Sequence, residues 1–133
     1  MADHLKHTLQ EIFRRRSVIF GPRVLFAYVF GSTGTAGQNE HSDLDIAVYL
    51  DMDAHTFELE HKLVLYTEIS RAVKRNDIDL VILNVFNNQV LLYQILTKGE
   101  LIYDADPAAR AIFEQKALHA AIDFKQRRER IFG

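Results

Sequence analysis

Residues 24–50 read VLFAYVFGSTGTAGQNEHSDLDIAVYL, and this stretch decides the fold that we expect. Residues 24–30 form a continuous run of β-branched, aromatic and other apolar side chains, which is typical of a strand buried on both faces. Gly31 and Ser32 end that run and predict a turn. Residues 46–50 form a second run of the same kind, so the stretch reads as strand, Gly-Ser turn, short helix over 33–36, loop and strand.

Two carboxylates stand where the second predicted strand begins. Side chains alternate along a strand, so Asp43 and Asp45 are predicted to point to the same face. Neighbouring carboxylates repel one another and lose hydration, and a cation between them removes that cost. Hard oxygen ligands suit Mg²⁺ or Mn²⁺. The pair therefore predicts a divalent metal site.

A third apolar run, residues 78–83, carries Asp79 in its interior. A buried strand seldom holds an unpaired carboxylate, so this residue needs a reason to be there. If the third strand lies beside the second, Asp79 joins the first two carboxylates on one face. Asp77 is an alternative to Asp79 as the third carboxylate, because residues two apart on a strand point to the same face. We favour Asp79 because Asp77 follows Asn76 in a predicted turn, where aspartate is common.

Three carboxylates facing a Gly-Ser turn suit phosphoryl or nucleotidyl transfer. Two metal ions held about 3.5–4 Å apart can orient the attacking and leaving oxygens. A turn at a helix N-terminus supplies backbone N–H groups for phosphate oxygens. Gly31 lets that backbone come close to the phosphates, and Ser32 can add a hydroxyl donor. Asp79 can accept the proton of an attacking hydroxyl or complete the metal shell.

These residues together resemble a known signature. Gly31-Ser32, ten further residues and then Asp43-Leu44-Asp45 look like the GSx10DxD motif of the DNA polymerase β-type nucleotidyltransferase superfamily. Asp79 is similar to the third carboxylate of that superfamily, which follows on a later strand. The small size and the segment 101–104 resemble the minimal nucleotidyltransferases, the MNT antitoxins paired with HEPN ribonuclease toxins.

The resemblance implies a fold, an activity and a partner. The fold would be the small mixed sheet flanked by helices of the polymerase β-type nucleotidyltransferases. The activity would be transfer of AMP from ATP, with two Mg²⁺ or Mn²⁺ ions, to a tyrosine hydroxyl of a HEPN toxin, which silences its ribonuclease. Gly31 and Ser32 would hold the triphosphate. Asp43 and Asp45 would bind metal, and Asp79 would be a metal ligand or the general base.

Composition restricts the remaining choices. The 133 residues suit one domain, 1–133, and the net charge of −2 gives no global field that attracts nucleic acid, so we expect no direct nucleic-acid binding. The absence of cysteine excludes disulfides and thiolate chemistry. No apolar run approaches the roughly 20 residues of a membrane span, and the N-terminus carries charges where a signal peptide needs an apolar stretch. We expect no membrane partner and a cytoplasmic location.

The rest of the chain reads as helices with one short strand. Apolar periodicity predicts helices over residues 3–16, 54–75, 89–97 and 108–130, and a short edge strand over 101–103. The connection between the first two strands is short for a right-handed crossover, so we expect them to pair antiparallel within a mixed α/β (α+β) sheet. The side chains predicted to face the core from the second and last helices are Phe57, Leu59, Leu63, Val64, Tyr66, Ile69, Val73, Ile112, Phe113, Leu118, Ile122 and Phe124.

Two questions stay open at this point. The charge runs at residues 14–16 and 125–130 are usually explained as solvated helix faces, and a partner-binding role is the alternative, because a small transferase must hold its acceptor somewhere. The function also has two alternatives to toxin adenylylation. One is nucleotidyl transfer to a small molecule such as an aminoglycoside, for which the short chain leaves little room. The other is a non-catalytic antitoxin that masks its partner.

Overall fold

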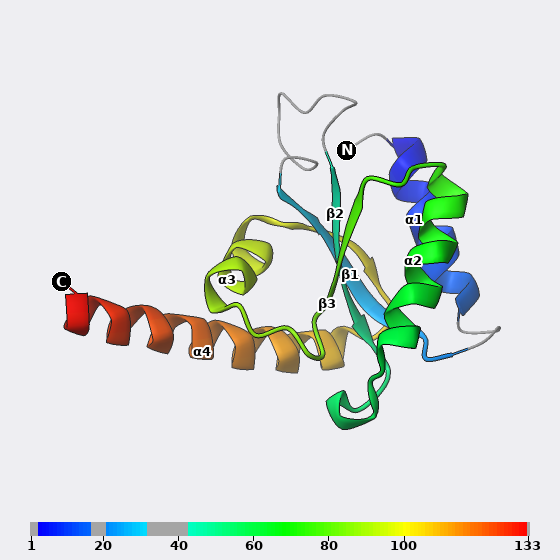
Figure 1. Cartoon of the computed structure of the whole chain (residues 1–133). Coiled ribbons are helices and arrows are strands. Elements are labelled where there is room, and N and C mark those ends of the chain that lie inside the picture. Colours follow the sequence, from blue (N-terminus) through cyan, green and yellow to red (C-terminus); the bar gives the residue numbers. More distant parts are fainter. Residues whose placement is uncertain (1–2, 17–20, 32–42, 133) are drawn as a thin grey trace.

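The computed structural model describes residues 3–16, 21–31 and 43–132, so the predicted short helix over 33–36 lies outside them (Figure 1). The elements in chain order are α1 (Asp3–Arg16), β1 (Val24–Phe30), β2 (Leu44–Leu50), the 3₁₀ helix η2 (Ala54–Thr56), α2 (Leu59–Val73), β3 (Ile78–Ile82), α3 (Gln89–Lys98), β4 (Glu100–Asp104) and α4 (Pro107–Phe132). None of the described helices is both long enough and apolar enough to cross a lipid bilayer.

The four strands form one mixed sheet in the order β3-β2-β1-β4. β1 runs antiparallel to β2 and to β4, and β2 runs parallel to β3. The predicted antiparallel pairing of the first two strands is therefore confirmed, as are the mixed sheet and the edge position of the last strand. α2 lies in the connection between β2 and β3, as a parallel pair requires a long crossover.

Each face of the sheet is covered by a pair of helices, α1 with α2 on one side and α3 with α4 on the other (Figure 1). β1 lies between its two neighbours and is buried along its whole length, as its unbroken apolar sequence predicts. β2 divides its side chains between the faces. Leu44, Ile46 and Val48 pack in the α1/α2 core, whereas Ala47 packs in the α3/α4 core.

The predicted helix over residues 54–75 is wrong in its first part. Residues 54–56 form a 3₁₀ turn in which the Asp53 carboxylate accepts a hydrogen bond from the backbone N–H of His55. A capping box then starts α2: the backbone N–H of Glu58 donates to His61 Nδ1, and the Glu58 side chain accepts from the backbone of His61. Local capping thus separates two pieces that apolar periodicity joins.

Several apolar side chains predicted to face the core are exposed instead. On α2 these are Leu59, Leu63 and Val64, and Leu65 and Ile69 are the fully buried positions. The corresponding exposed residues on α4 are Ile112, Ile122 and Phe124, while Ala117 and Ala121 are buried. Small side chains let α4 lie close to α3, so the larger residues on its neighbouring faces are left outside.

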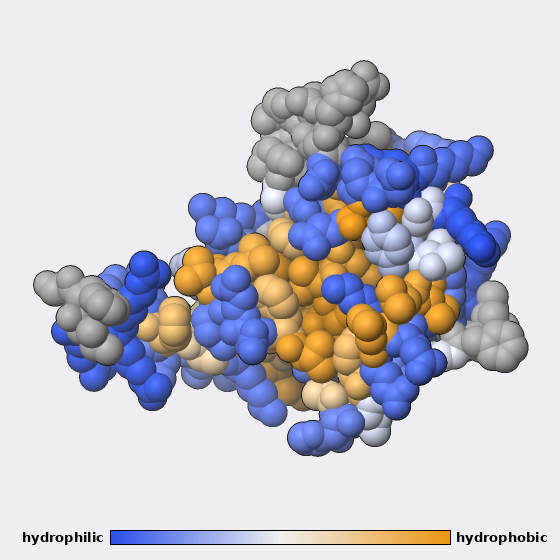
Figure 2. Space-filling view, in the orientation of Figure 1, coloured by the Kyte–Doolittle hydropathy of each residue, from blue (hydrophilic) through white to orange (hydrophobic). Residues whose placement is uncertain are grey.

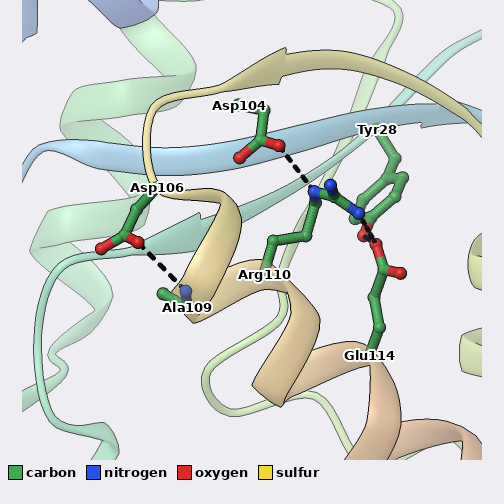
Figure 3. A network of polar contacts seen from close by, with 6 residues as sticks. All are labelled: Tyr28, Asp104, Asp106, Ala109, Arg110 and Glu114. Atoms are coloured by element: carbon green, nitrogen blue, oxygen red, sulfur yellow. Dashed lines mark hydrogen bonds and ion pairs between the residues drawn. The ribbon is translucent and has the colours of Figure 1, made fainter.

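α4 begins at Pro107, one residue before the predicted start, with a side-chain cap. The Asp106 carboxylate accepts a hydrogen bond from the backbone N–H of Ala109 at 3.0 Å, and Pro107 occupies the first helical position (Figure 3). This arrangement satisfies one of the N–H groups that a helix start leaves unpaired.

A polar network ties the first half of α4 to the sheet (Figure 3). Arg110 donates from Nε to Asp104 on β4 at 2.7 Å and from Nη1 to Glu114 at 2.9 Å. The hydroxyl of Tyr28 on β1 donates to the same oxygen of Glu114 at 2.5 Å. Burial and the Glu114 carboxylate raise the pKa of Tyr28, so its hydroxyl stays a donor at neutral pH.

We expect Arg110→Met to lower the free energy of unfolding by about 2 kcal/mol, because Asp104 and Glu114 would lose their cation while remaining partly buried. Among the described residues, Asp104 Oδ1 already has no hydrogen-bond partner. Urea unfolding measures the change. Arg127→Met on the same helix is the control, because it breaks only the exposed pair with Asp123 and should cost little. Equal losses in the two variants would contradict a structural role for the network.

Candidate active site

Asp45 on β2 and Asp79 on β3 are direct neighbours in the parallel ladder. Side chains of a strand point alternately to the two faces of the sheet. Leu44 and Ile46 pack on the α1/α2 side and Ala47 on the α3/α4 side, so Asp45 points to the face that α3 and α4 cover. Asp79 has the parity of Val81 and belongs to the same face. The strand register therefore brings these two carboxylates together at the end of the sheet where β2 and β3 begin.

Gly31 lies against the carboxylate of Asp45. The antiparallel register pairs Phe30 with Asp45, and Gly31 follows at once with a φ of +70°. A Cβ atom at position 31 would stand 2.3 Å from Asp45 Oδ2, which no real side chain tolerates. Glycine is thus required twice here, for its left-handed backbone and for the close approach of Asp45.

Asp43 immediately precedes β2 and is exposed. Burial, then the charge of Asp79 and then that of Asp43 raise the pKa of Asp45 to about 6 from its ordinary value of 3.8. The three carboxylates therefore interact electrostatically. Within the described part of the chain, no three His, Asp or Glu side chains stand close enough to hold one metal ion. The metal roles of Asp43, Asp45 and Asp79 stay a prediction.

The donor set nevertheless fits a magnesium ion. Mg²⁺ in enzymes is commonly bound by one or two carboxylates together with water and substrate phosphates. Asp45 and Asp79 supply two such oxygen donors side by side, and burial together with the charges of Asp79 and Asp43 raises the pKa of Asp45. A divalent cation beside them would favour the ionised form of Asp45.

Asp77, the alternative to Asp79, is held by an arginine. Arg75 donates from Nε to one carboxylate oxygen of Asp77 at 2.8 Å and from Nη2 to the other at 2.6 Å. These hydrogen bonds hold the pKa of Asp77 below its usual range. The backbone carbonyl of Asp77 also accepts from Leu44 N–H at 2.9 Å, which fixes the start of β2 against β3. Asp77 therefore already has an internal cation.

Sequence reasoning missed Arg75. Its charge was assigned to the end of a helix, but α2 ends at Val73, and Lys74 has a left-handed φ of 57°. Arg75 then lies near the candidate site, where hydrogen bonding to Asp77 and, less strongly, the charge of Asp43 raise its pKa. A cation two residues before an aspartate was the only signal in the sequence. Ser32, the other predicted phosphate-binding residue, lies outside the described residues, so its role stays a prediction.

The family of the chain follows from a comparison with protein-family models. Residues 7–108 match the model described as Polymerase beta, Nucleotidyltransferase. The chain belongs to this nucleotidyltransferase family, and the fold and superfamily predicted from the sequence are confirmed. No curated protein matches the chain.

Solved structures share the fold over almost the whole chain. A chain from a toxin–antitoxin complex with AMP-PNP has a TM-score of 0.75 at 23% identity, covering 95% of this chain and 94% of that one. A tri-AMPylated Shewanella oneidensis HEPN toxin in complex with MNT antitoxin gives 0.71 at 21%, covering 98% and 95%. A MntA-HepT toxin–antitoxin complex gives 0.70 at 22%, with the same coverage. At these identities the likeness establishes the shared fold.

We expect Gly31→Ala to impair nucleotide binding, because the new methyl group displaces the Asp45 carboxylate and strains the backbone. Gly21→Ala is the matched control: Gly21 also has a positive φ, of 83°, but its Cβ would meet only the flexible end of Arg16, at 3.0 Å. Isothermal titration with Mg²⁺ and ATP measures the loss of ATP affinity, and thermal unfolding measures the loss of stability separately. Both variants should lose stability and only Gly31→Ala should bind ATP at least tenfold more weakly. Equal ATP affinity in the two would refute the contact.

Asp45 makes a second prediction, which concerns stability without metal. Its raised pKa means that the folded state binds the proton more tightly than the unfolded chain, so stability falls as pH rises from 3.8 to about 6. In EDTA, Asp45→Asn should therefore unfold at a higher temperature than the wild type at pH 7.5, and this gain should vanish near pH 4. Asp51→Asn, at the exposed opposite end of β2, should show no such gain. A gain independent of pH would contradict the electrostatic cause.

Proposed function

We propose that this nucleotidyltransferase is an antitoxin that transfers AMP from ATP to a tyrosine hydroxyl of a HEPN ribonuclease toxin and so neutralises it. The observation that carries the proposal is the pairing of Asp45 with Asp79 beside Gly31. The shared fold with chains from HEPN–MNT complexes, one of them with AMP-PNP and another with a tri-AMPylated toxin, supports the donor and the acceptor. ATP and a ribonuclease target both belong to the cytoplasm, where we place the reaction.

The triphosphate would lie along the turn that begins at Gly31. Because Gly31 has no side chain between the backbone and the Asp45 carboxylate, a phosphate held near Asp45 would lie close to that backbone, and Ser32 would add a hydroxyl donor. Asp43, Asp45 and Asp79 would hold Mg²⁺, which when bound would offset the negative charge of the phosphates and the carboxylates. These residues thus orient the α-phosphorus towards an incoming hydroxyl.

The transfer itself forms one bond and breaks one. The tyrosine oxygen of the acceptor attacks the α-phosphorus of ATP, the bond between the α-phosphorus and the bridging oxygen breaks, and pyrophosphate leaves. The hydroxyl proton goes to a carboxylate. Asp79, whose side chain is exposed, accepts that proton where it does not complete the metal shell, which Asp43 and Asp45 would then hold.

The test is incubation of the purified chain with ATP, Mg²⁺ and a HEPN protein, which we expect to be encoded beside it, followed by intact-mass analysis. The toxin should gain one or more AMP groups and lose ribonuclease activity. EDTA should abolish the gain. Because metal binding requires ionised carboxylates, the rate should also fall at acidic pH, where protons compete with Mg²⁺ for Asp45, whose pKa is raised by burial. Transfer that continues in EDTA would reject the metal assignment.

Catalysis and masking are separated by a variant that replaces two of the site carboxylates with amides. Asp43→Asn with Asp45→Asn should reduce AMP transfer by at least a hundredfold and abolish neutralisation of the toxin, because it removes two of the three carboxylates. Asp51→Asn with Asp123→Asn removes the same charge from exposed positions away from the site and should leave both unchanged. Neutralisation that survives in the first double variant would favour masking over catalysis.

A further inference from the structure

The second half of α4 extends past the part of the helix that packs on the body of the molecule (Figure 1). The helix has 26 residues, which corresponds to a length of about 39 Å. Its last buried side chain is Ala121, and residues 122–130 are all exposed. An unsupported helix of this length is marginal in water, so a partner that covers it would stabilise it.

A groove of about 500 Å³ lies between this part of α4 and α3. Its apolar lining includes Val90 and Tyr93 on α3 and Ile122 and Phe124 on α4, each between 39% and 49% exposed. Figure 2 shows hydrophobic surface reaching from the middle of the molecule to the region where α3 and α4 meet, with hydrophilic surface around it. Two aromatic rings in one groove are the kind of anchor that dominates protein interfaces.

The edge of the groove is positively charged, although the whole chain is not. Lys98, Lys125 and Arg128 line it, against the single carboxylate of Glu129, whereas the net charge of the chain is −2. A partner with carboxylates beside an apolar stripe complements this pattern. A second copy of the chain does not, because an interface around a two-fold axis would bring the same basic residues together.

The groove also lies on the correct side of the sheet for an acceptor. α3 and α4 cover the face to which Asp45 and Asp79 belong, and α1 and α2 cover the other. A protein seated between α3 and α4 is therefore on the same side as the candidate active site. Docking there would hold a hydroxyl-bearing segment near the carboxylates.

We infer that the groove between α3 and the second half of α4, lined by Tyr93, Phe124 and a basic edge, docks an acidic amphipathic helix of the acceptor protein. A concave groove between two helices fits a rod-shaped helix better than the flat surface of a membrane. The identification of that acceptor with the HEPN toxin rests on the proposed function. The groove would thus supply the affinity for the acceptor that the carboxylate site does not.

The test measures the affinity of the chain for the HEPN protein by biolayer interferometry. Tyr93→Ser with Phe124→Ser should weaken binding at least tenfold, and Lys98→Glu with Lys125→Glu and Arg128→Glu should do so more strongly at low salt than at high salt. Leu59→Ser with Leu63→Ser on α2 is the matched control. It removes two exposed apolar side chains, 64% and 54% exposed, from the opposite side of the sheet and should change the affinity less than twofold.

Other readouts separate this inference from the proposed function. Each groove variant should bind Mg²⁺-ATP as the wild type does, and the Asp43→Asn, Asp45→Asn protein should bind the partner normally. Groove variants with wild-type affinity would overturn the docking surface and leave the function standing. Partner binding that needs the groove but yields no AMP transfer would support the surface and count against the function. Self-association of the wild type that the groove variants abolish, or no binding of the HEPN protein at all, would overturn the inference.

Discussion

The parallel pairing of β2 with β3 is the constraint on which the site depends. It sets Asp45 directly beside Asp79, and burial together with the charges of Asp79 and Asp43 makes Asp45 hard to ionise. Burial and the neighbouring negative charges make the ionised form of Asp45 costly, and a proton or a bound cation relieves that cost. The strand pairing therefore holds two carboxylates side by side in an arrangement that favours a cation.

The rest of the fold provides the rigidity that this arrangement needs. β1 is buried along its whole length between β2 and β4, so the strand that leads into Gly31 has no freedom to shift. Near the same site, Arg75 donates two hydrogen bonds to the Asp77 carboxylate, and the backbone carbonyl of Asp77 accepts from the backbone N–H of Leu44. This ion pair gives Asp77 a cation, whereas Asp45 lies beside the negative charges of Asp79 and Asp43.

The sequence predicted much of this because the relevant signals are local. The unbroken apolar run of β1 gave its bounds, and the apolar spacing gave α1. Side-chain parity placed Asp45 and Asp79 on one face once the strands were taken as neighbours. The start of α2 was missed because the capping of Glu58 by His61 competes with apolar periodicity. Arg75 was missed because its position depends on the left-handed turn at Lys74, which no pattern in the sequence announces.

The exposed apolar residues of α4 were misplaced for a different reason, and it concerns function. The apolar spacing of the helix predicts that Ile122 and Phe124 are covered, but it does not say whether this chain or another molecule covers them. Within this chain, the Arg110 network and the buried Ala117 and Ala121 fix α4 as far as residue 121, and residues 122–130 are exposed. An apolar side chain that its spacing predicts to be buried, and that is exposed in the isolated chain, is typical of a residue that contacts a partner protein. The same periodicity that fails as a prediction of the monomer core therefore supports α4 as a binding element.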